Sequence, residues 1–69
     1  MNQLSPVLAT LKNGDAVKIV LQNGSITGRL EEYRQDIDAI EISDVYSSGI
    51  YVSSLFTIST YLILELAKL

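Results

Sequence analysis

Three consecutive side chains near the middle of the chain, Tyr33, Arg34 and Gln35, could bind a single-stranded nucleic acid. A tyrosine ring can stack on an exposed base, and an arginine can pair with a phosphate or stack on a base itself. The alternative is structural, with Tyr33 covering the core and Arg34 pairing with Asp36 or Glu32. The residue types alone leave both interpretations open.

Two carboxylates and two hydroxyls could add hydrogen bonds to such a site. Asp36 and Asp38 could accept from base amino groups, although each would repel a neighbouring phosphate. They lack a third ligand at a suitable spacing, so we predict no metal site, and solvated loop residues are the alternative. Ser53 and Ser54 could hydrogen-bond a base or a sugar, but a serine at a strand end commonly satisfies its own backbone.

Catalysis has little support in the sequence. The chain contains no histidine and no cysteine, so the commonest general base and the thiolate nucleophile are both excluded. No serine and lysine stand at a spacing that suggests a nucleophile and its base. The adjacent acids Glu31 and Glu32 are not evidence of tuned pKa values. We therefore predict that the protein is not an enzyme and needs no cofactor.

Composition limits the architecture and the partners. A chain of 69 residues forms one domain, residues 1–69, which buries only about 60% of its unfolded surface. Because 48% of the residues are apolar, self-association is expected. The net charge of −3 argues against duplex DNA as a partner. No secretory signal is evident in residues 1–14 and the apolar tail is too short to span a bilayer, so a soluble, cytoplasmic protein is expected.

A short helix and five strands are expected to position these side chains. Ser5 and Pro6 form a good helix start, and Asn13-Gly14 can end the helix after two turns. Asn23-Gly24 between two alternating apolar runs predicts a hairpin with a type I′ turn. Gly28 predicts a bend or a close backbone approach. The expected strands cover residues 15–22, 25–33, 37–43, 50–53 and 56 to about 64 or 66, with a turn over 44–49 and a break at 53–54.

The order Gly24, Ile26, Gly28, Leu30 and Tyr33 resembles the first sequence motif of the Sm fold, which Sm, Sm-like (LSm) and bacterial Hfq proteins share. The resemblance implies a mainly β fold, in which a short N-terminal helix precedes a five-stranded, strongly bent antiparallel small barrel of the SH3-like kind. Other SH3-like barrels or an OB-like barrel are the alternatives.

The ligand-binding half of the family's signature differs from this chain. Arg34 stands where the family usually has Asp, and Asp38 stands where it usually has a base-contacting Asn. The pair Ser53-Ser54 stands where Arg-Gly or Lys-His is usual. The resemblance is thus carried by residues of the scaffold.

The resemblance implies a homo-oligomeric ring of identical subunits, closed by pairing strand four of one subunit with strand five of the next. It also implies binding of single-stranded RNA near the pore, with a role in RNA processing or regulation. An oligomeric scaffold or protein-interaction ring without nucleic-acid binding is the alternative. The predicted interface residues are Ile50, Tyr51, Val52, Phe56, Ile58, Tyr61 and Ile63.

Overall fold

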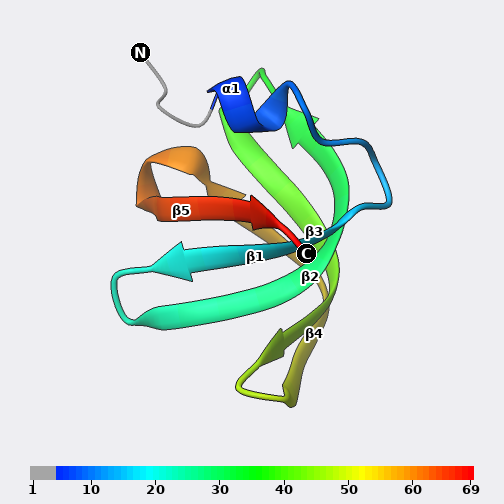
Figure 1. The fold of residues 1–69 in the computed structure, drawn as a ribbon, viewed down its shortest axis with the longest axis vertical. Coiled ribbons are helices and arrows are strands. Elements are labelled where there is room, and N and C mark those ends of the chain that lie inside the picture. The colour runs from blue at the N-terminus through cyan, green and yellow to red at the C-terminus, as the bar shows by residue number, and fades with distance from the viewer. Residues whose placement is uncertain (1–4) are drawn as a thin grey trace.

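The computed structural model describes residues 5–69 as one bent antiparallel sheet preceded by a short helix (Figure 1). The strand order is β4-β3-β2-β1-β5, so β4 and β5 are its two edges. The predicted mainly β, five-stranded fold with a short N-terminal helix is confirmed. The elements are α1 (Ser5–Leu8), β1 (Ala16–Leu21), β2 (Gly24–Arg34), β3 (Ala39–Ser47), β4 (Ile50–Ser59), the 3-10 turn η1 (Thr60–Leu62) and β5 (Ile63–Lys68).

The core lies on the concave side of the bent sheet. The alternation predicted for the first two strands is confirmed, since Val17, Ile19 and Leu30 are buried and Leu21 and Ile26 pack against them. Burying this apolar surface is the main stabilising contribution to a domain of this size. The remaining buried members of the cluster are Ile40, Ile42, Val45, Ile58, Ile63 and Leu66.

Gly28 permits the sheet to bend at β2. A Cβ atom built on this residue would lie 3.0 Å from the carbonyl oxygen of Ser43 on β3. The pairing of β2 with β3 also shifts register between Thr27 and Arg29. The predicted close backbone approach is therefore confirmed.

The helix is shorter than the sequence predicts. It ends at Leu8, and the backbone of Lys12 donates instead to the Asp15 carboxylate over 2.9 Å. Gly14 has a φ of +97°, and its N–H donates to the carbonyl oxygen of Leu30 on β2. This contact holds the chain against β2 directly after the helix. Leu11 still packs against the core beside Val7 and Leu8.

The first hairpin is confirmed, but its predicted turn type is wrong. Leu21 pairs with Gly24, so Gln22 and Asn23 are the turn residues, and neither has a positive φ. The two positive φ values expected of a type I′ turn occur instead at Ser48 and Gly49, which join β3 to β4.

The turn predicted over residues 44–49 is wrong for its first four residues. β3 continues through them to Ser47. Asp44 adopts a φ of +50°, and the pairing with β4 shifts register between Val45 and Tyr46, so the strand contains an irregularity but does not end there. The turn-forming residues thus produce an irregularity within a long strand. The resulting β3–β4 hairpin extends from the body of the molecule (Figure 1).

The strand break predicted at Ser53-Ser54 is also wrong, as is the start of the fifth strand at Phe56. β4 runs unbroken from Ile50 to Ser59, and β5 begins only at Ile63. Pairing with β3 on both sides of the serines, at Val45↔Ser53 and Ser43↔Leu55, holds the strand together. Among residues 5–69, no helix is long and apolar enough to cross a membrane.

Candidate nucleic-acid interface

The link between β2 and β3, residues 35–38, lies beside η1. Asp38 ends the link with a φ of +51°, and its carbonyl oxygen accepts a hydrogen bond of 3.0 Å from the backbone N–H of Thr60. Thr60 is buried, so this contact is shielded from water. The fold therefore joins the link, which carries Gln35, Asp36 and Asp38 of the predicted site, to the connection between the two edge strands.

Tyr33 packs against the core and also reaches the link. Its half-buried ring lies against the apolar cluster, and its hydroxyl donates to Asp38 Oδ1 over 2.7 Å. The structural alternative for this residue is thus present in the unbound protein. The same hydrogen bond fixes the orientation of the Asp38 carboxylate, which is exposed.

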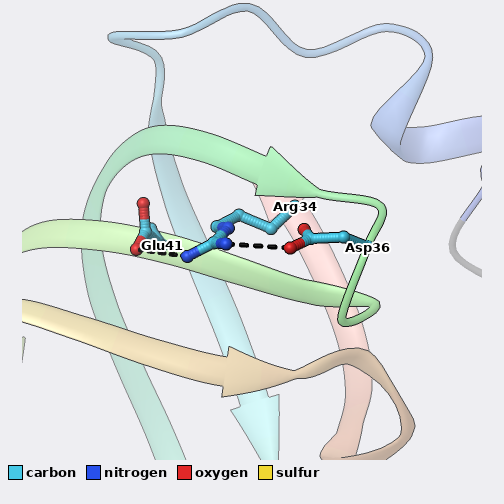
Figure 2. A network of polar contacts seen from close by, with 3 residues as sticks. All are labelled: Arg34, Asp36 and Glu41. Carbon is cyan, nitrogen blue, oxygen red and sulfur yellow. Dashed lines mark hydrogen bonds and ion pairs between the residues drawn. The ribbon is translucent and has the colours of Figure 1, made fainter.

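Arg34 lies between two carboxylates (Figure 2). Its Nη2 donates to Asp36 Oδ2 over 2.9 Å, and its Nη1 lies 4.0 Å from Glu41 Oε2 on β3. The sequence offered Asp36 or Glu32 as partners; the structure selects Asp36 and adds Glu41. Glu41 was missed because its position depends on the β2–β3 register, in which it pairs with Glu32.

The hydrogen bond between the two side chains shifts both titrations. Donation from Arg34 lowers the pKa of Asp36, and acceptance by Asp36 raises the pKa of Arg34. Asp36 therefore stays ionised at neutral pH and remains an acceptor. Both side chains are well exposed, so the ion pair contributes little to folding and can exchange partners.

We expect the Asp36 carboxyl to titrate below the ordinary aspartate value of about 3.9 in an NMR pH titration. Because its folded pKa is lowered, the pair's stabilising contribution is present above that value and is lost as the pH falls through the folded pKa. Replacing Arg34 with Gln should raise the midpoint toward the ordinary value. A midpoint in the unaltered protein at or above the ordinary value would contradict the pairing.

The structure does not bring all the predicted site residues together. Gln35, Asp36 and Asp38 are exposed on the link, but Ser53 and Ser54 lie in the middle of β4. Ser53 Oγ donates to the Leu55 carbonyl and accepts from the Leu55 N–H, so it satisfies local backbone. β4 reaches the link through Ser59, which pairs with Ala39.

Apolar side chains are exposed along β4, on η1 and, at Leu64, on β5. Of the predicted interface residues, five are exposed, whereas Ile58 and Ile63 belong to the core of the chain itself at 4% and 7% exposure. Three other exposed residues, Leu55, Leu62 and Leu64, are not among the predicted interface residues. The five exposed predicted residues are Ile50, Tyr51, Val52, Phe56 and Tyr61.

A groove of about 460 Å³ connects the two edges. It lies between the β1–β2 hairpin and the segments β4, η1 and β5, and much of its lining is apolar. Phe56 lines it from β4, Tyr61 and Leu62 from η1, and Leu64 from β5. The exposed apolar surface is therefore continuous from one edge strand to the other.

No family model matches the chain, and no curated protein matches it. Among solved structures, it is similar to that of the Sm protein of Pyrococcus abyssii in complex with a uridine heptamer. The two chains are 19% identical, the match covers 100% of each, and the TM-score is 0.67. The fold expected from Gly24, Ile26, Gly28, Leu30 and Tyr33 is therefore the observed one, and this chain has the Sm-like fold.

Proposed function

We propose that this protein forms a homo-oligomeric ring that binds single-stranded RNA near its pore, with a cytoplasmic role in RNA processing or regulation. The observation that carries the proposal is the hydrogen bond from Thr60 to Asp38, which holds the β2–β3 link against η1. It keeps the link that directly follows Tyr33 and Arg34 beside η1, in the fold of a protein solved with uridine RNA.

The arginine is suited to exchange a carboxylate for a phosphate. Its pair with Asp36 is exposed, so breaking it costs little, and a phosphate can take the same Nη2 donor. Asp36 and Glu41 meanwhile weaken the attraction, because a phosphate at Arg34 would lie close to both carboxylates. We therefore expect each subunit alone to bind RNA with weak or moderate affinity. Several subunits that bind one RNA strand together increase the overall affinity.

The ring is supported by the two open sheet edges. β4 and β5 each present unpaired backbone groups together with exposed apolar side chains, and edges of this kind associate unless they are covered. In a ring, one neighbouring copy supplies its β5 to β4, and the neighbour on the other side supplies its β4 to β5, so both edges gain a strand. A head-to-tail contact between β4 and β5 repeats by rotation and closes after about five to seven subunits.

A scaffold or protein-interaction ring without RNA binding is the second candidate. It is favoured by the pairing of Arg34 with Asp36 and Glu41, which leaves more negative than positive charge at the link. The two candidates share the ring and differ in whether RNA binds.

The proposal predicts that Arg34→Ala weakens RNA binding more than Arg29→Ala does. Arg29 is exposed on β2 away from the link, and its replacement removes the same charge, so it is the matched control. For each phosphate that the variant no longer neutralises, the slope of log K against log salt should become shallower by roughly 0.7. Fluorescence anisotropy with a uridine heptamer at several salt concentrations measures both quantities. Equal losses in the two variants would show general charge attraction, and no binding by the unaltered protein would favour the scaffold.

A further inference from the structure

We infer that Asn23 is a site of spontaneous modification, at which the side-chain amide is lost and the residue becomes aspartate or isoaspartate. The chain contains two Asn-Gly pairs, Asn13-Gly14 and Asn23-Gly24. All four residues are exposed, so neither the sequence nor the exposure separates the two pairs. The structure separates them by the contacts that hold the glycine nitrogen.

The reaction needs only the chain and water. The backbone nitrogen of Gly24 attacks Cγ of the Asn23 side chain, and the new C–N bond closes a five-membered succinimide ring. The bond from Cγ to Nδ2 breaks, and the amide nitrogen leaves as ammonia with the proton of the glycine N–H. Water then opens the ring at either carbonyl carbon, which gives aspartate or isoaspartate. Glycine favours the attack because it has no Cβ atom to hinder a close approach of its backbone.

The pair Asn23-Gly24 lies at the tip of the β1–β2 hairpin, where few contacts hold the backbone. Asn23 is a turn residue, and Gly24 forms with Leu21 the last pair between the two strands. Gly24 has a φ of +146°, and a Cβ atom built on it would meet no atom within 4 Å beyond its chain neighbours. Opening of this terminal pair frees the nitrogen, and the end of a hairpin opens more readily than its interior.

The pair Asn13-Gly14 is held between hydrogen bonds on both sides. The Gly14 N–H donates to the Leu30 carbonyl over 2.6 Å, and the Leu30 N–H donates to the Asp15 carbonyl over 2.8 Å. The Lys12 N–H donates to the Asp15 carboxylate over 2.9 Å, and the Asp15 N–H donates to the Lys12 carbonyl over 3.0 Å. Because Leu30 belongs to the buried core, these bonds must open together before the Gly14 nitrogen can attack.

The new carboxyl group would lie at the groove between the two sheet edges. Asn23 lines this groove together with the apolar side chains of Phe56, Leu62 and Leu64. An aspartate is ionised at neutral pH, and a charge beside apolar side chains opposes their burial by another copy of the chain. The modified chain should therefore assemble less readily than the new one. This consequence rests on the proposed ring, whereas the modification itself does not.

The test follows the folded protein over days in mildly alkaline buffer. Peptide mapping by tandem mass spectrometry measures the fraction of aspartate and isoaspartate at positions 13 and 23. We expect conversion at Asn23 to be about tenfold faster than at Asn13, because further backbone hydrogen bonds must open at the slower site. In denaturing urea the two rates should become similar. Asn23→Gln should abolish the faster reaction, since its longer side chain would have to close a larger ring.

Asp15→Ala separates geometry from sequence. It removes the carboxylate that accepts from the Lys12 N–H, so conversion at Asn13 should rise while conversion at Asn23 stays the same. Conversion at Asn13 as fast as at Asn23 in the unaltered folded protein, or none at Asn23, would overturn the inference.

Sedimentation velocity of Asn23→Asp tests the consequence for assembly, with Asn23→Gln as the uncharged control. We expect more single subunits in Asn23→Asp at the same protein concentration. Equal assembly of the two variants would overturn the effect on assembly. If the unaltered protein is a monomer, the proposed ring fails and this consequence fails with it, whereas the difference between the two Asn-Gly pairs stands on the mass spectrometry alone.

Discussion

Replacing Val52 on β4 and Leu64 on β5 with lysine is expected to break the proposed ring into single subunits. Both residues are exposed on the edge strands, at 53% and 67%. A lysine on each edge places a charge where the neighbouring subunit must pack an apolar side chain, and edge lysines are the usual obstacle to strand pairing. Sedimentation velocity should show a subunit of 7.6 kDa in place of the assembly.

RNA binding should fall with the assembly. If several subunits engage one strand, separating them removes the avidity and lowers the apparent affinity by a factor of about 10²–10⁴. The two added lysines by themselves would attract RNA, so a loss cannot be attributed to charge. Ala9→Lys, at an exposed position outside the edge strands, is the control and should keep both the assembly and its RNA binding. An assembly that survives the two lysines would contradict the β4–β5 contact.

Replacing Ile42 with Ala is expected to lower the free energy of unfolding by about 2–5 kcal/mol. Ile42 is fully buried on the central part of β3, between Leu30 on β2 and Phe56 on β4. A Cβ atom built on Gly28 would lie 3.4 Å from Cδ1 of Ile42. The cavity left by the substitution would therefore open where the sheet bends. At roughly 0.05–0.15 kcal/mol per residue, a chain of 69 residues has a total stability of about 3–10 kcal/mol, so the loss is a large share of it.

Ile37→Ala is the matched control for this change, since it removes the same atoms from a residue that is 52% exposed on the β2–β3 link. It should alter the free energy of unfolding by no more than about 0.5 kcal/mol. Urea unfolding followed by circular dichroism measures both, at one protein concentration because assembly adds to the apparent stability. Equal losses in the two variants would mean that the described core is not what stabilises the fold.

The elements that depend on local pattern could be predicted from the sequence. The alternation of Val17, Ile19 and Leu30 identified buried positions, because strand periodicity is a property of neighbouring residues. Gly28 identified the close approach of β3, since a glycine on the inward face contributes no packing of its own. Together with Gly24, Ile26 and Tyr33, these residues carried the resemblance to the Sm fold.

The ends of β3 and β4 could not be predicted, because pairing between strands determines them. Asp44 and the serines at 53–54 are turn-forming residues, and their local preferences predicted a turn and a break. In the structure, long-range pairing keeps both segments extended, and the irregularities are absorbed by a positive φ at Asp44 and a side-chain hydrogen bond at Ser53. Tertiary context outweighed local propensity at both places.

In the candidate site too, contacts between neighbouring residues could be predicted from the sequence, and contacts that depend on strand pairing could not. The contact between Arg34 and Asp36 spans two residues and could be foreseen from their charges. Glu41 and Thr60 could not, because one reaches the site through the β2–β3 register and the other through the position of η1 after a long β4. The expectation that Ser53 and Ser54 adjoin the link depended on a short fourth strand, and the structure places them elsewhere.

Native mass spectrometry of the purified protein, with and without a short single-stranded RNA, shows directly whether the protein forms a ring that binds RNA. We expect one closed assembly of about five to seven subunits that gains a single RNA. The same assembly without bound RNA would support the scaffold instead. A monomer would contradict the proposed ring, because the exposed edges of β4 and β5 would then have no partner in other copies of the chain.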